Sequence, residues 1–135
     1  MFSKNRIIST FATFVPIYFL PWIFYSYLAA DFFESQMLTD VSRGEDMLLL
    51  PLTLGCIIMA YVFSSIYEGW DKDSYSIPSG IRFGVLIGLF FGAGIGLVMY
   101  GTELRTTAIG HLIDGIFWVI TYAITGIVAS IVYKR

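Results

Sequence analysis

Apolar residues gather along the chain into four long stretches that carry no formal charge, at residues 7–30, 47–67, 83–102 and 115–133. About 20 helical residues cross the roughly 30 Å hydrocarbon core of a bilayer, at a rise of about 1.5 Å per residue. A backbone amide left unpaired in lipid costs several kcal/mol, so segments of this length are expected to be helices. With a few polar residues added to the third and fourth stretches, the predicted spans are residues 7–30, 47–67, 81–102 and 109–133.

These spans predict an all-α protein, with a single domain over residues 1–135 built as an integral membrane bundle of four transmembrane helices. The connections are short, which makes consecutive helices antiparallel neighbours. A transmembrane barrel would show short segments of alternating polarity, and the sequence has none. Lys4 and Arg6 precede the first span as in a signal peptide, but the apolar run is longer than the h-region of such a peptide. We therefore expect the first span to be retained.

Composition supports a membrane protein and excludes other classes. Hydrophobic residues make up 57% of the chain and charged residues 13%, whereas soluble domains carry about 25% charged residues. A disordered chain would have low hydrophobicity and high net charge. The formal net charge of -2 argues against nucleic acid as a partner, because nucleic acid binds to basic patches. The lone cysteine, Cys56, rules out a disulfide framework.

The distribution of basic residues predicts the orientation of the bundle. Lysine and arginine concentrate at the two chain ends and around the second connection, whereas the first and third connections carry only Arg43 and Arg105. Basic residues favour the cytoplasmic side, so both termini are expected in the cytoplasm. The first connection, residues 31–46, is then external and acidic. Aromatic residues near the outer end of the first span are expected to form an interfacial belt: Trp22, Tyr25 and Tyr27.

A stripe of glycines marks the third span. Its members recur every four residues: Gly80, Gly84, Gly88, Gly92 and Gly96. This spacing forms a groove of small residues into which another helix fits closely. A helix of the same chain, a partner chain or second copy, and a lipid or pigment tail are the three candidate occupants. Gly126 and Ser130 in the fourth span have the same spacing, which makes that span one candidate.

Two pairs of polar residues are candidates for a site. His111 and Asp114 are three residues apart, so they share a helix face. They form a candidate polar site that could relay protons or bind a quinone headgroup. The alternative is a structural role at the interface, because the dipole at a helix start favours an acid. Glu68 and Arg82 flank the second connection and form a candidate ion pair. Pro16 and Pro21 lie inside the first span and are expected to kink it.

The sequence offers little support for enzymatic chemistry. The single histidine excludes a bis-histidine haem, and the chain has no set of zinc ligands and no phosphate-binding glycine loop. No Ser-His-Asp motif is evident either. We therefore expect no catalytic residues, no metal and no cofactor.

One segment resembles a known group of proteins. Tyr67-Glu68-Gly69, followed by Gly80-Ile81-Arg82-Phe83-Gly84 and Gly88, resembles small bacterial four-span membrane proteins with a Y-E-G turn and a G-x-R-F-G-x-x-x-G third helix. The resemblance is strongest over residues 61–96. It implies a four-span topology and a bacterial inner membrane, and the group has no assigned activity. The linker here, Trp70-Asp71-Lys72-Asp73, is more acidic than that of the group.

Two functions from different classes are favoured, and a membrane enzyme or quinone-site protein that uses His111 and Asp114 is a third hypothesis. The first is a structural or accessory subunit, which packs through its glycine stripe or aromatic surface against lipid, other membrane subunits or copies of itself. The second is an oligomeric transporter or channel for a small solute or for protons, which uses Asp114 and His111. Small multidrug exporters are disfavoured because they need a glutamate in the first span, and small fluoride channels because the first span lacks their opening motif.

Overall fold

The computed structural model describes residues 3–135, and these residues form helices without any strand. Two segments interrupt the helical order with the wider turn of a π-helix, and one short segment is a 3-10 helix. In chain order the elements are α1 (Lys4–Ile23), π-helix η1 (Phe24–Leu28), α2 (Ala30–Gln36), 3-10 helix η2 (Gly44–Asp46), α3 (Leu49–Trp70), α4 (Ile77–Gly88), π-helix η3 (Leu89–Ile95), α5 (Gly96–Thr102) and α6 (Ala108–Lys134).

Four helical segments are long and apolar enough to cross a membrane, which confirms the predicted number of spans. They are Lys4–Leu28, Leu49–Trp70, Ile77–Thr102 and Ala108–Lys134. The first, third and fourth begin at Lys4, Ile77 and Ala108, before the predicted starts at residues 7, 81 and 109. Polar side chains cap these starts: Ser3, Ser76 and Thr107 each accept a hydrogen bond from a backbone N–H three residues on. A cap sets where a helix begins, whereas hydropathy marks only where the apolar run begins.

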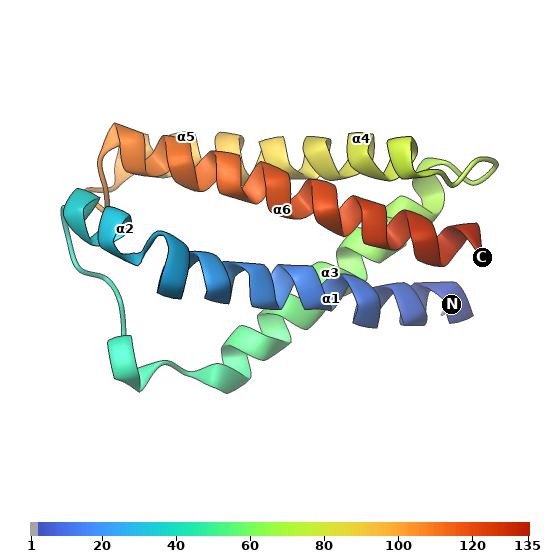
Figure 1. Ribbon diagram of the computed structural model, residues 1–135, viewed down its shortest axis with the longest axis horizontal. Helices are drawn as coiled ribbons and strands as arrows, with labels where there is room; N and C mark the ends of the chain where they lie inside the picture. The colour runs from blue at the N-terminus through green and yellow to red at the C-terminus, as the bar shows by residue number, and fades with distance from the viewer. Residues whose placement is uncertain (1–2) are drawn as a thin grey trace.

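The two ends of the bundle differ in what they carry. The start of α1, the end of α6 and the loop at residues 71–76 lie at one end, called here the terminal end (Figure 1). The segments at residues 29–48 and 103–107 lie at the other, called here the two-loop end. Helix α6 packs against both α4 and α1, and α1 packs against α3. Helix α3 crosses the others diagonally and makes few contacts with α4 or α6.

Aromatic side chains fill the bundle from its middle to the terminal end. Phe63 of α3 packs against Phe83 of α4, with ring centroids 4.8 Å apart, and against Tyr122 of α6 at 5.8 Å. Tyr67 lies between Phe83 and Tyr133, at 5.4 and 5.7 Å. These rings are buried and belong to one apolar cluster. The terminal end is therefore the closed end of the bundle.

Hydroxyl groups join α1 to α3 beside this cluster. Ser64 of α3 shares hydrogen bonds with Ser9 at 2.8 Å and with Thr13 at 3.2 Å, and all three residues are fully buried. The Tyr133 hydroxyl donates to the Ser64 carbonyl at 2.9 Å. Small polar residues of this kind let membrane helices approach closely and bond to one another.

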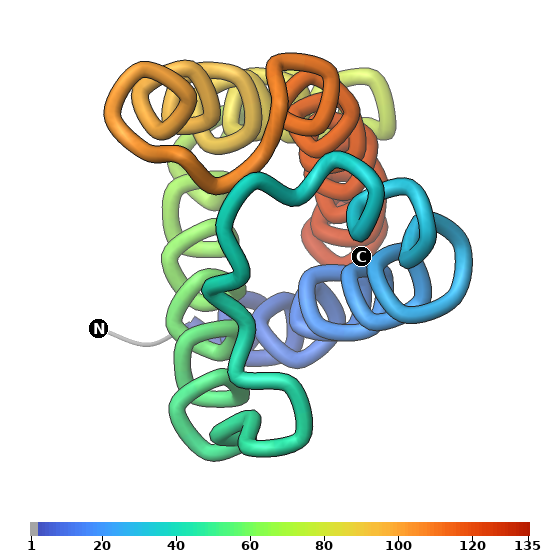
Figure 2. Tube along the Cα trace, turned by 90° about the vertical axis from the view of Figure 1, so that its left-hand side faces the viewer, coloured from blue at the N-terminus to red at the C-terminus, as the bar shows by residue number. Residues whose placement is uncertain are grey.

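The two-loop end is tied together through Gln36, the last residue of α2. Its carbonyl accepts hydrogen bonds from the Thr106 hydroxyl at 3.0 Å and from the Thr107 amide at 3.2 Å. The amide of Leu38 also donates to the Arg105 carbonyl at 3.0 Å. From there the chain runs across this end of the molecule to reach α3 (Figure 2).

Candidate functional site

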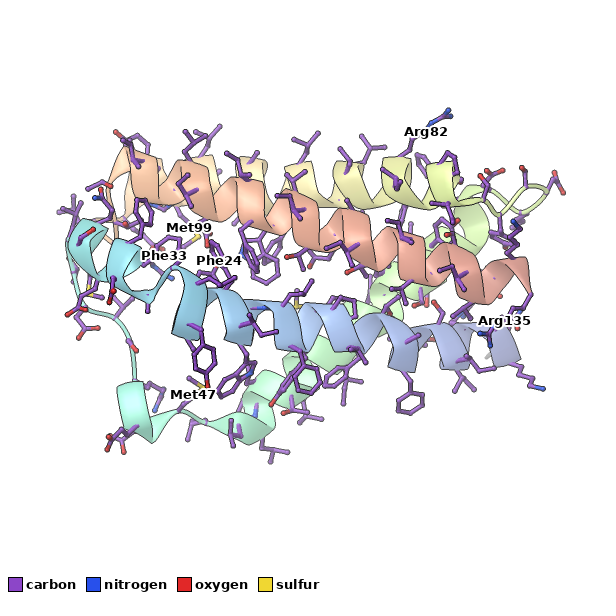
Figure 3. The ribbon with its side chains drawn as sticks, viewed as in Figure 1. Phe24, Phe33, Met47, Arg82, Met99 and Arg135 are labelled. Atoms are coloured by element: carbon purple, nitrogen blue, oxygen red, sulfur yellow. The ribbon has the colours of Figure 1, made fainter. Side chains whose placement is uncertain are left out.

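A cavity of about 560 Å³ opens at the two-loop end, between η1, η3, α5 and α6. Residues from the crossing segment, including Asp40 and Val41, line its outer side. Helix α3 contributes none of the lining residues in the described chain. Its diagonal course keeps its first residues apart from α5 and α6. Figure 3 labels two of the wall residues, Phe33 and Met99.

Asp114 lies about two turns into α6 and lines this cavity. The hydroxyl of Tyr25 donates a hydrogen bond to its Oδ1 atom, and within residues 3–135 its other oxygen accepts no hydrogen bond. Tyr25 and Asp114 both line the cavity. The structure thus holds a carboxylate at one oxygen and leaves the other available to a ligand.

Tyr25 is the second residue of the π-helix η1. Helix α1 continues through Pro16 and Pro21, and the turn widens three residues after Pro21. The amide of Ala29 then bonds to the carbonyl of Phe24, five residues earlier, at 2.8 Å. Phe24 stacks on Phe117 of α6 with ring centroids 4.0 Å apart. Tyr25 also contacts Phe117, edge-on at 5.3 Å, whereas Tyr27 and Leu28 of the same segment are exposed. Segments of this kind are frequent at functional sites.

His111 lies one turn before Asp114 and lines the same cavity. The structure brings the two predicted site residues together, but no hydrogen bond joins them within residues 3–135. The His111 ring makes an edge contact with Tyr100, with centroids 5.7 Å apart. Its Nε2 atom is buried and has no hydrogen-bond partner in the described chain. A buried polar atom without a partner is uncommon and points to a role beyond packing.

Aromatic and sulfur-containing side chains form part of the remaining wall. Phe33, Phe91 and Trp118 line the cavity, and Phe91 packs edge-on against Trp118 at 4.9 Å. Met37 and Met99 lie on the loop side. Apart from Asp114, the ionisable lining residues are Asp40, His111 and Arg105. Arg105 pairs with Glu103 at 3.2 Å, which balances its charge.

A second, apolar groove of about 580 Å³ lies between η3, α5 and α6. Gly92, Gly96 and His111 line both this groove and the cavity. These three residues therefore form the thin wall between the two spaces.

Four of the five stripe glycines face α6 directly. A Cβ at Gly80 would meet the carbonyl of Gly126, and one at Gly84 the carbonyl of Tyr122. A Cβ at Gly88 would lie 2.6 Å from the Val119 Cα, and one at Gly92 would lie 2.7 Å from the Gly115 carbonyl oxygen. These separations are too short for a side chain. The groove along this part of the third span is occupied by a helix of the same chain.

The fifth stripe residue, Gly96, behaves differently. Nothing lies within 4 Å of a Cβ built there. The π-helix Leu89–Ile95 comes directly before it and changes the turn on which the four-residue spacing depends. Gly96 consequently leaves the contact with α6 and opens onto the cavity.

The expected ion pair between Glu68 and Arg82 does not form. Glu68 bonds instead with Arg6 of α1, whose Nε donates at 2.7 Å, and with the Ser3 hydroxyl at 2.5 Å. Arg82 is exposed and points away from the bundle (Figure 3). The two residues flank the same loop, but α4 turns its Arg82 face outward because the glycine face must meet α6.

The loop at the terminal end adds one further contact to Glu68. The hydroxyl of Tyr75 donates to the Glu68 carbonyl at 2.7 Å. Burial, and then the nearby carboxylates, raise the pKa of Tyr75 above its ordinary value, so the hydroxyl keeps its proton. This contact holds the loop against α3.

Sequence reasoning missed Tyr25 and Arg6 as members of these contacts. Tyr25 was expected in an interfacial aromatic belt with Trp22 and Tyr27, and only the other two remain outside, with Tyr27 82% exposed. The one signal for Tyr25 was Pro21, which lies four residues before it and weakens the regular helix there. Arg6 was counted as an orientation signal alone.

Comparison with known proteins identifies no relative. No protein-family model, curated protein or solved structure matches the chain.

Proposed function

We propose that this chain is a multi-pass membrane carrier that binds a small solute in the cavity at the two-loop end. The observation that supports this most is the position of the Asp114 carboxylate. Asp114 belongs to a candidate membrane span and lines a largely apolar cavity, where its carboxylate accepts a hydrogen bond from Tyr25. Ionisable residues at membrane depth are costly, and they commonly mark substrate or ion pathways.

The shape of the bundle supports a carrier rather than an open channel. Aromatic packing and the Arg6–Glu68 salt bridge close the terminal end, whereas the other end contains the cavity. A carrier exposes its site to one side of the membrane at a time, and a bundle closed at one end corresponds to one of those states. His111 borders the site and serves as a second polar contact for the solute.

The orientation completes the proposal. We place both termini in the cytoplasm of a bacterial cell and the two-loop end outside the inner membrane, on the distribution of basic residues and the resemblance given above. The cavity then faces the exterior. A reporter enzyme fused after Arg135 tests this, because a reporter that is active only in the periplasm should be silent there.

Release from vesicles tests the carrier itself. Vesicles containing the purified protein are loaded with three impermeant solutes: benzyltrimethylammonium, phenylmethanesulfonate and a sugar alcohol. At least one should leave faster than from vesicles without protein, and Asp114→Asn should abolish the difference. Asp31→Asn, an exposed acid of α2, is the matched control and should behave as the unchanged protein. Equal release from vesicles without protein, with the unchanged protein and with either variant would contradict the proposal.

A second candidate is an accessory subunit, and the exposed half of α3 favours it. Leu50 and Leu54 are 72% and 50% exposed, and α3 packs mainly against α1. A partner helix from another membrane subunit or from a second copy would cover this face. The mass of the tagged protein, extracted in a mild detergent, distinguishes the candidates. A large assembly containing other proteins favours the accessory role, and an isolated chain or small homo-oligomer favours the carrier.

A further inference from the structure

We infer that the solute is an organic cation with an apolar or aromatic body, bound with its charge at Asp114. This inference rests on the proposed function of the cavity and names the chemical class that the cavity selects. Three features of the described residues support it: the available carboxylate oxygen, the balance of charge around the cavity, and the aromatic wall.

The first feature is the state of the Asp114 carboxylate. Tyr25 donates to Oδ1, and no residue in the described chain donates to Oδ2. A carboxylate removed from bulk water gains most from a cation, because a charge pair is strengthened where water is excluded. An anionic solute would meet this carboxylate as a like charge.

The second feature is the charge around the cavity. Asp40 lines it together with Asp114, and the basic Arg105 is held by Glu103 at 3.2 Å. The covering segment at residues 37–48 carries three acidic residues against the single Arg43. Acidic residues at the mouth of a low-dielectric cleft raise the local concentration of cations. His111, the remaining ionisable group of the wall, lies against the ring of Tyr100.

The third feature is the aromatic wall. Phe33, Phe91 and Trp118 line the cavity with Tyr25, and the faces of such rings attract cations. Organic ammonium groups are recognised in this way, because they hold little water and fit between rings. Met99 and Ile95 supply apolar surface for the rest of the solute.

Three solutes that share a benzyl group test the inference. Benzyltrimethylammonium is the cation, neopentylbenzene replaces its nitrogen with carbon, and phenylmethanesulfonate carries the opposite charge. Binding is followed by the fluorescence of Trp118, in a variant with Trp22→Phe and Trp70→Phe. We expect the cation to bind about tenfold more tightly than the other two, which corresponds to about 1.4 kcal/mol.

Two substitutions assign this preference to its residues. Asp114→Asn should reduce the preference for the cation to less than about threefold, and Asp31→Asn should leave it intact. Asp40→Lys reverses the charge of an exposed loop residue whose carboxylate accepts one hydrogen bond, from the Ser42 amide, and it should weaken cation binding and strengthen sulfonate binding. A preference that survives both Asp114→Asn and Asp40→Lys would overturn the inference.

The outcomes separate this inference from the function on which it rests. Tightest binding of the sulfonate, or equal binding of all three solutes, overturns the cation preference and leaves a solute-binding cavity. Failure of all three to change Trp118 fluorescence contradicts the cavity as a binding site, and the inference falls with it.

Discussion

Arg6 and Glu68 form a salt bridge that joins the first turn of α1 to the last turns of α3. Both side chains are about one-fifth exposed, at 22% and 23%, and Ser3 adds a hydrogen bond to the same carboxylate. Two spans that are separated by the 29–48 segment in sequence are thereby fastened at the end where the bundle closes. In the carrier proposal this pair must separate when the terminal end opens.

Replacing Glu68 tests how much this fastening contributes. Glu68→Gln should lower the melting temperature by several degrees, because the Arg6 guanidinium loses its charged partner in a partly buried place. Arg82→Gln is the matched control on the other side of the loop and should leave the melting temperature unchanged, since Arg82 is exposed. Thermal denaturation in detergent measures both. Equal shifts for the two variants would count against the pairing described here.

Gly92 and Gly96 are successive members of the glycine stripe, but they have different surroundings in the fold. Gly92→Ala should lower the free energy of unfolding by about 1–3 kcal/mol, because the added carbon would lie 2.7 Å from the Gly115 carbonyl oxygen. Gly96→Ala should be neutral or stabilising, since alanine favours the helix and nothing lies near. Unfolding of each variant in mixed micelles gives the comparison. A loss at Gly96 as large as that at Gly92 would show that the stripe continues into a contact with another chain.

Tyr25 should stabilise the protein through its hydroxyl as well as its ring. Tyr25→Phe keeps the ring contacts with Phe33 and Phe117 and removes the bond to Asp114. We expect a loss of about 1–3 kcal/mol in the free energy of unfolding, because a half-buried carboxylate loses its donor. Tyr18→Phe in the same span is the control, since within the described residues its hydroxyl accepts one long bond, of 3.4 Å, from Thr53. If both variants unfold alike, the Tyr25–Asp114 bond contributes nothing to stability.

Ser64 and Ser65 are adjacent in α3, but their hydroxyl groups bond to different helices. The Ser64 hydroxyl meets Ser9 and Thr13 of α1, whereas the Ser65 hydroxyl donates to the Tyr61 carbonyl of its own helix at 2.7 Å. Ser64→Ala should cost about 0.6 kcal/mol and at most about 1.7 kcal/mol, the average and the maximum for hydrogen bonds between membrane helices. Ser65→Ala should cost less. The difference in unfolding free energy measures the α1–α3 contact, and its absence would mean that packing alone holds these helices together.

The four spans could be predicted from the sequence because hydropathy depends only on local composition. The close approach behind the glycine stripe also has a local signal, since a small residue every fourth position must lie along one face. The spacing did not identify the occupant of that face. That required knowing that α4 lies beside α6, an arrangement decided by the whole bundle.

The contacts of the charged residues had no local signal. Glu68 is closer in sequence to Arg82 than to Arg6, and the pair forms with the more distant residue because α1 and α3 are neighbours. Asp114 could be recognised as a candidate from its place in an apolar stretch. Its partner Tyr25 could not, because the pair joins residues far apart in the sequence and forms only where α1 lies beside α6.

Each π-helix holds one residue more than a regular helix would need for the same turn. Because a helix rotates by about 100° per residue, removing one residue from Leu89–Ile95 would restore the regular turn and rotate residues 96–102, the remainder of that span. A homologue with such a one-codon deletion would keep four hydrophobic spans and an unchanged hydropathy profile. It would nonetheless return Gly96 to the surface of α6, so an alignment gap at this position would separate chains that keep this wall of the cavity from chains that have lost it.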